Sequence, residues 1–174
     1  MAFIQPGGVA ARVRFTEFLA ADDPMLLAWA RFRGTLAGPS GVDTHAHPVK
    51  AAHPQSGLWR LLATNNRELG RSFLLYRRYE AARAHVEQLQ RDSGELAIKL
   101  IHGPHNGSRG WIITAADAPV MTCSRWYSSS SAGAIAAAGA LEAFRGALLT
   151  DAPDRSDASG RYRRRKPGAA HVHS

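Results

Sequence analysis

The residues from Trp111 to Ser130 read WIITAADAPVMTCSRWYSSS, and their order of signals predicts the repeating unit of the fold. Its first five residues have the aromatic and β-branched composition of a strand, ADAP is a turn, and VMTC returns as a second strand. The serines at 128–131 can cap a helix, and an apolar stripe with helical spacing follows at Ala134, Ala137, Leu141, Phe144 and Leu148. Together they predict a unit of two strands and one helix.

The same order of signals occurs earlier in the chain. Residues 58–63 have strand composition, Asn65-Asn66 tolerates the left-handed backbone angles of a hairpin turn, and residues 68–73 return as a strand. Helical spacing then runs from Tyr79 to Leu89. The matched positions are Trp59 with Trp111, Ala63 with Ala115, Leu69 with Met121, Ser72 with Ser124, Leu89 with Leu141 and, after a one-residue gap, Tyr76 with Tyr127.

Two such units predict an α+β fold. A strand–strand–helix unit cannot bury its apolar faces alone, so tandem repeats should form one antiparallel sheet with helices on one face. The residues expected to be mostly buried are Trp59, Trp111, Leu89 and Leu141. The expected organisation is an N-terminal helical segment at 1–36, a flexible linker at 37–56, a first unit at 57–94, a connecting strand and loop at 95–109, a second unit at 110–150 and a disordered basic tail at 151–174.

The second copy resembles the YegP-like family, small bacterial proteins built from tandem strand–strand–helix repeats. The resemblance rests on the opening Trp111, the turn Asp117-Ala118 and the junction Ser124-Arg125-Trp126-Tyr127-Ser128-Ser129, which is similar to the family's Ser-x-x-Tyr-x-Ser element. The first copy departs at Arg78, where the family usually has a capping Ser or Thr, but keeps Trp59, Ser72 and Tyr76. Neither copy has the usual Asn-Gly turn. The resemblance implies an antiparallel sheet backed by helices, and it implies no catalytic residues.

The chain is basic and long enough for one compact domain. Its 174 residues carry a formal net charge of +8, and 45% of them are hydrophobic. A basic balance favours acidic partners such as nucleic acid or an acidic protein, although genomic base composition is an alternative source of the arginines. A single cysteine, no secretory signal and no apolar run long enough for a bilayer predict a cytoplasmic protein with no membrane association.

Two groups of basic residues are candidate contacts for an anion or nucleic acid. Arg77-Arg78 precedes the helix predicted at Tyr79, whose N-terminus carries partial positive charge, so a bound anion would relieve local repulsion. The second group lies in the tail and comprises Arg161, Arg163, Arg164, Arg165 and Lys166. The alternative is a solvated basic face, because no recognised nucleic-acid-binding motif accompanies these residues.

Tyr76 and Tyr127 each stand at a junction between a strand and a helix. They could face a ligand with their phenol groups, or they could pack the junction, and we favour packing. Cys123 on the return strand is typical of an inert packing residue. No metal and no cofactor is expected, because the histidines lie in linkers and loops rather than converging: His45, His47, His53, His102 and His105.

These patterns favour a non-catalytic binding module with acidic partners, and an enzyme is disfavoured. One alternative is a self-associating interaction protein with no nucleic-acid role, a homo-oligomer whose exposed strand edge pairs with a second copy. The other is an enzyme with an unrecognised site, which would require a pocket with converging titratable groups. A long, uncharged edge strand would favour the first alternative, and such a pocket would favour the second.

Overall fold

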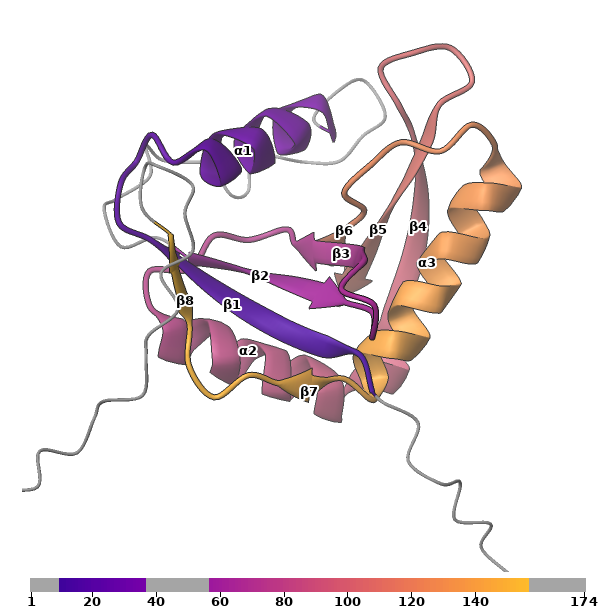
Figure 1. The fold of residues 1–174 in the computed structure, drawn as a ribbon. Coiled ribbons are helices and arrows are strands. Elements are labelled where there is room, and N and C mark those ends of the chain that lie inside the picture. Colours follow the sequence, from indigo (N-terminus) through magenta and orange to yellow (C-terminus); the bar gives the residue numbers. More distant parts are fainter. Residues whose placement is uncertain (1–9, 37–56, 157–174) are drawn as a thin grey trace, which may run out of the picture.

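The computed structural model describes residues 10–36 and 57–156, which form a mixed eight-stranded sheet with three α-helices (Figure 1). The protein is therefore α+β, as the sequence predicts. The elements in chain order are β1 (Arg12–Phe18), α1 (Pro24–Leu36), β2 (Gly57–Leu62), β3 (Glu68–Ser72), α2 (Tyr79–Arg91), a 3₁₀ turn (Ser93–Glu95), β4 (Leu96–His102), β5 (Arg109–Ala115), β6 (Ala118–Thr122), α3 (Ser130–Arg145), β7 (Leu148–Leu149) and β8 (Asp154–Ser156).

The strand order divides the sheet into two halves. It runs β4-β5-β6-β3-β2-β1-β7, and β8 also pairs with β1. We call β1, β2, β3 and α2 the first unit, and β4, β5, β6 and α3 the second unit. The units meet where β3 and β6 pair antiparallel, with Arg71 opposite Thr122 and Ser72 opposite Met121. Within the first unit, α1 and the linker 37–56 separate β1 from β2, whereas only the loop 103–108 separates β4 from β5.

The sheet is not wholly antiparallel, which corrects one expectation. β1 pairs antiparallel with β2 but parallel with both β7 and β8. The parallel pairs arise because the chain that leaves α3 returns along the outer edge of β1. Arg14 holds this return in place by donating two hydrogen bonds of 3.0 Å to the Asp154 carboxylate.

Two flanking segments also differ from the sequence interpretation. Residues 12–18, placed in an N-terminal helical segment, form β1, and the helix is confined to α1. Residues 154–156, placed in a disordered tail, form β8. Short alternating runs such as these carry a weak signal, because their pairing partners are distant in sequence. The linker 37–56 and the rest of the tail lie outside the described residues.

Side chains of α2 direct the chain that leaves α3. Tyr79 OH and Arg83 Nη1 donate to the carbonyl oxygen of Thr150, at 3.0 and 2.8 Å. Gln90 Nε2 donates to the carbonyl oxygen of Phe144 at 2.9 Å. These three contacts position the segment in which β7 and β8 form.

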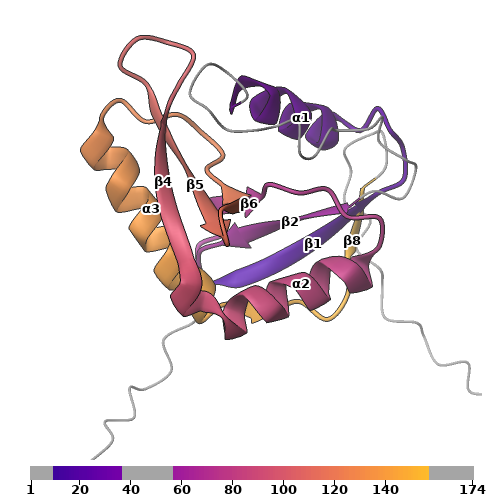
Figure 2. The same cartoon turned by 180° about the vertical axis from the view of Figure 1, so that it is seen from behind.

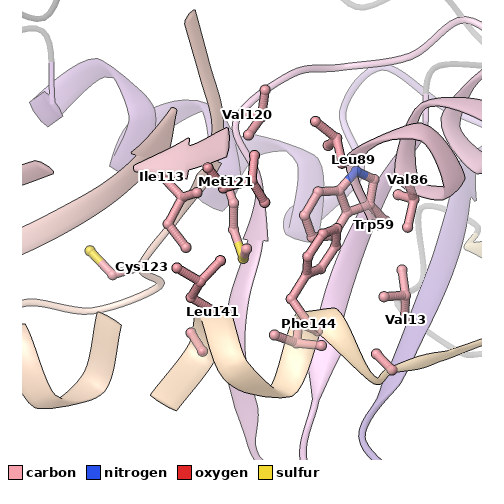
Figure 3. Packing of buried hydrophobic residues seen from close by; sticks show 14 of the residues in the cluster. Val13, Trp59, Val86, Leu89, Ile113, Val120, Met121, Cys123, Leu141 and Phe144 are labelled. Atoms are coloured by element: carbon pink, nitrogen blue, oxygen red, sulfur yellow. The ribbon is translucent and has the colours of Figure 1, made fainter. Parts of the chain in front are cut away.

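The main core lies between the sheet and the two helices α2 and α3. Trp59 and Trp111 are 0% exposed, Leu89 is 5% exposed and Leu141 is 7% exposed, which confirms the expected burial. The Trp59 ring stacks on Phe144 of α3, with ring centroids 5.6 Å apart (Figure 3). The two units therefore share one core, because a helix of the second unit covers a strand of the first.

Helix α1 covers the opposite face of the sheet (Figures 1 and 2). Leu58, the neighbour of Trp59 on β2, clusters with apolar residues of α1, and adjacent strand residues point to opposite faces. Trp29 Nε1 donates to the carbonyl oxygen of Ser72 at 2.9 Å. Asp23 caps the start of α1, since its Oδ1 accepts a hydrogen bond from the Met25 backbone N–H at 2.9 Å. The helices thus lie on both faces, with α2 and α3 together on one.

The β2–β3 and β5–β6 hairpins use left-handed turn residues. Asn66, between β2 and β3, has φ 64°, as the Asn65-Asn66 pair predicts. Between β5 and β6, Ala116 and Asp117 have φ 47° and 66°. Two consecutive positive φ values are the geometry of the type I′ hairpin turn, which matches the twist of the flanking strands.

Candidate functional site

Arg77 and Arg78 lie at the N-terminus of α2, as the sequence predicts. Both are exposed, and Arg78 is the N-cap residue, with no side chain capping the helix. Neither forms an ion pair with another described residue. The basic residues 161–166 lie outside the described residues, so the two basic groups are not placed together. An anion at this helix end would meet two guanidinium groups and uncapped backbone N–H groups.

Helix α3 begins differently. Its N-cap is Ser129, whose Oγ accepts a hydrogen bond of 3.1 Å from the Ala132 backbone N–H. The expected capping role of the serine run is thereby confirmed. Of α2 and α3, only α2 begins without a side-chain cap. Its N-cap residue is Arg78, and an arginine side chain has hydrogen-bond donors but no acceptor.

The strand–helix junction of the first unit contains a chain of three hydrogen-bonded side chains. Trp59 Nε1 donates to Tyr76 OH at 3.3 Å, and Tyr76 OH lies 2.6 Å from His85 Nδ1. Burial raises the pKa of Tyr76 to about 12, and burial lowers the pKa of His85. At neutral pH the indole donates to a neutral phenol, which donates to a neutral imidazole. The chain satisfies the buried indole N–H, so Tyr76 serves packing, as we favoured from the sequence.

The corresponding junction of the second unit lacks this chain. Tyr127 pairs through its backbone with Arg109, just as Tyr76 pairs with Gly57. However, Trp111 Nε1 is buried without a hydrogen-bond partner, and no hydrogen bond of Tyr127 OH is found among the described residues. Ala136 stands seven residues after the N-cap of α3, where His85 stands after the N-cap of α2.

A cleft lies at this open junction, between α3 and the hairpin of β2 and β3. We call it the α3 cleft, and its volume is about 630 Å³. One wall consists mainly of small residues of α3, and Tyr127 lies beside it. The lining residues are Ala63, Arg67, Glu68, Leu69, Arg125, Tyr127, Ala132, Ile135, Ala136, Gly139 and Ala140.

The α3 cleft combines an apolar wall with positive charge. Glu68 is neutralised by Arg71, whose guanidinium donates to both carboxylate oxygens at 2.7 and 2.9 Å. Arg67 forms no ion pair within the described part of the chain. Arg125 stacks on the ring of Tyr127, with its guanidinium carbon 4.9 Å from the ring centroid. Two guanidinium groups therefore remain available to an anion.

Sequence reasoning missed the α3 cleft. The available signal was the spacing of Ala132, Ala136, Gly139 and Ala140, which puts small side chains on one helix face. From the sequence, we assigned Ala134 and Ala137 of the same alanine-rich run to the apolar stripe and gave the four residues no role. The alternative that Tyr127 faces a ligand applies to this unit alone, because Tyr76 is closed off by His85.

Cys123 and several histidines are further candidates from the sequence. Cys123 is buried, and burial raises the pKa of its thiol, which disfavours the reactive thiolate. Within residues 10–36 and 57–156, no three His, Cys, Asp or Glu side chains come together in a way that could hold a metal ion. His45, His47 and His53 lie outside this range. No helix in the same range has the length and apolarity needed to cross a bilayer.

Two solved structures of proteins of unknown function are similar to this chain. One is yegP from E. coli, with 13% sequence identity and a TM-score of 0.47 over 87% of this chain and 97% of that one. The other is a UPF0339 protein from Shewanella oneidensis, with 14% identity and a TM-score of 0.46 over 79% of this chain and 89% of that one. The first of them bears the name of the family that the second copy resembles in sequence. No protein-family model and no curated protein matches the sequence.

Proposed function

We propose that the protein is a cytoplasmic, non-catalytic binding module that associates electrostatically with nucleic acid. The observation that carries the proposal is the exposed pair Arg77 and Arg78 at the uncapped N-terminus of α2. The cluster from Arg161 to Lys166 adds positive charge near the end of the chain. Binding of phosphates by these residues would release counterions, which is the main source of sequence-independent affinity.

The proposed binding tolerates any sequence. The arginines at the start of α2 stand at a helix end and not along a helix face, so they do not form a compact set for reading base edges. Affinity should fall steeply as salt rises, because each neutralised phosphate contributes about −0.9 to the slope of log K against log salt for duplex DNA.

The test is fluorescence anisotropy with mixed-sequence duplex DNA and single-stranded RNA over a range of salt. Arg77→Ala with Arg78→Ala should weaken binding and flatten the slope by roughly 1 to 2. Arg91→Ala with Lys99→Ala is the control that removes equal charge elsewhere. A variant that ends at Ser156 removes the basic cluster and retains β8, whose Ser156 Oγ donates to Asp23 Oδ2 at 2.6 Å. Truncation there should weaken binding further.

Two outcomes contradict the nucleic-acid proposal. One is the absence of binding at low salt. The other is binding that strongly prefers one sequence and barely responds to salt, because base-edge contacts would then dominate.

The edge of the second unit favours a second candidate function, self-association. β4 ends the sheet, and no described strand pairs with its outer edge. Ile98 and Leu100 on this strand are 39% and 42% exposed, and Lys99 is the residue of β4 with a permanent charge. Such an edge is a template for pairing with a second copy. Analytical ultracentrifugation should show a dimer that Leu100→Lys dissociates; a monomer at all concentrations would exclude it.

We also propose that the two units are tandem copies of one ancestral unit. The support is their common order of three strands and a helix, and the matching backbone bridges Gly57–Tyr76 and Arg109–Tyr127. The burial pattern of the helices aligns His85 with Ala136 and Leu89 with Ala140, so Leu141 corresponds to Gln90. This alignment replaces the sequence-based match of Leu89 with Leu141, because the one-residue gap at the junction carries through the helix.

A further inference from the structure

We propose that the α3 cleft binds a small amphipathic anion, a molecule with an apolar body and a carboxylate group. The site is separate from Arg77 and Arg78, so the inference does not depend on nucleic-acid binding. Its volume of about 630 Å³ lies within the range of about 300–1,000 Å³ that is usual for small-molecule sites.

The cleft exists because α3 has small side chains where α2 has large ones. Counted from the two N-caps, Ala136, Gly139 and Ala140 stand where α2 has His85, Gln88 and Leu89. In the first unit, His85 and Leu89 are packed against the sheet side of the helix. In the second unit, the corresponding space is left to the cleft, whose wall includes all three small residues. An apolar ligand body would occupy the space that the side chains of His85 and Leu89 fill in the first unit.

The charges at the cleft select an anion. Arg67 and Arg125 line it from two different segments, the β2–β3 hairpin and the junction before α3. The carboxylate of Glu68 is already occupied by the guanidinium of Arg71. The cleft is therefore positively charged overall, and guanidinium groups bind carboxylates with charge-assisted hydrogen bonds.

A polar group in the cleft also lacks a partner. Tyr127 lines the cleft, and its OH has no acceptor in the described part of the chain, whereas Tyr76 OH has His85. The indole N–H of Trp111, which does not line the cleft, is buried and unpaired, whereas in the first unit Trp59 donates to Tyr76. A ligand with a hydrogen-bond acceptor would satisfy the phenol as the imidazole does in the first unit.

The test uses decanoate as the probe and decan-1-ol as its uncharged counterpart. Two-dimensional ¹H–¹⁵N NMR of the full chain is recorded during titration below micelle-forming concentrations. Decanoate should shift the amide signals of Tyr127, Ala136 and Gly139, and it should bind about tenfold more tightly than decan-1-ol. Loss of this preference, or shifts confined to other regions, would overturn the proposal.

Variants separate the charge from the apolar wall. Arg67→Ala with Arg125→Ala should lower decanoate affinity about tenfold and leave decan-1-ol affinity unchanged. Gly139→Leu should abolish binding of both probes, because the glycine faces open space within the cleft. Ala138→Leu, at the exposed neighbouring position on α3, is the matched control and should leave both affinities unchanged.

The same decanoate titration of a variant at the start of α2 distinguishes binding at the α3 cleft from the proposed nucleic-acid binding. Arg77→Ala with Arg78→Ala should leave decanoate binding intact, whatever its effect on nucleic acid. If Gly139→Leu folds, as its NMR spectrum would show, and still binds decanoate with unchanged affinity, the α3 cleft is not the site. If decanoate does not bind the unaltered protein at millimolar concentration, the proposal is wrong.

Discussion

The first and second units differ in how completely their surfaces are covered. In the first, β7 and β8 pair with β1, and His85 closes the chain of hydrogen bonds from Trp59. In the second, no described strand covers the outer edge of β4, and Ala136 leaves Tyr127 beside a cleft. Both units have three strands and a helix, but in the described part of the chain only the first has its outer sheet edge paired and its junction tyrosine hydrogen-bonded. We therefore call the first unit closed and the second open. A few side chains and the chain after α3 account for the difference.

The closed unit depends on the open one for its core, and this dependence gives the largest expected effect. Phe144 of α3 stacks on Trp59 of β2, and both are 0% exposed. Phe144→Ala should lower the free energy of unfolding by about 3–5 kcal/mol, because it leaves a cavity against the indole. Chemical denaturation should show one transition for both units. Two separate transitions in the unaltered protein would mean that the units do not share a core.

The two junction tyrosines should differ in their contribution to stability. Tyr76→Phe removes the link between the indole of Trp59 and the imidazole of His85, and should cost about 1–3 kcal/mol. Tyr127→Phe removes a hydroxyl that has no partner among the described residues, and should change stability by less than about 0.5 kcal/mol. Equal costs, measured by urea denaturation, would abolish the distinction between a closed and an open junction.

The helix starts offer a smaller contrast, of opposite sign in the two units. Ser129→Ala should lower stability by about 1 kcal/mol, because the Ala132 N–H loses its acceptor. Arg78→Ser should raise stability by about 0.5–1 kcal/mol, because it gives α2 the cap that it lacks. A stabilising Ser129→Ala or a destabilising Arg78→Ser, in thermal denaturation, would contradict this description of the helix ends.

The smallest effect is a dependence on pH that arises in the closed unit. The pKa of His85 is lower in the folded protein than its ordinary value of 6.5, which we assign to the unfolded chain. As pH falls below about 6.5, the unfolded chain takes up the proton first, so stability falls until the folded-state pKa is passed. Unfolding free energies at pH 7.5 and 5.5 should therefore differ less in His85→Gln than in the unaltered protein. An identical difference in both would remove His85 as the cause.

The sequence was sufficient to predict β2, β3, α2, β4, β5, β6 and α3, and the burial of Trp59, Trp111, Leu89 and Leu141. Their signals are local: period, turn residues and capping residues, as at Asn66 and Ser129. It was insufficient for β1 and β8, because pairing between Thr16 and Asp154 is set by tertiary contacts. The α3 cleft could not be predicted either. Its wall at Ala136 is recognised only when α3 is compared with α2, which has His85 at the equivalent position.

Ala136 leaves the hydroxyl of Tyr127 without a partner among the described residues of the second unit, whereas His85 pairs with the hydroxyl of Tyr76 in the first. A double-mutant cycle with Ala136→His and Tyr127→Phe tests this claim directly, by denaturation at pH 8, where the introduced imidazole is neutral. We predict a favourable coupling free energy of about 1 kcal/mol or more, because the introduced imidazole would accept the hydrogen bond of the phenol. A coupling within about 0.3 kcal/mol of zero would contradict the claim.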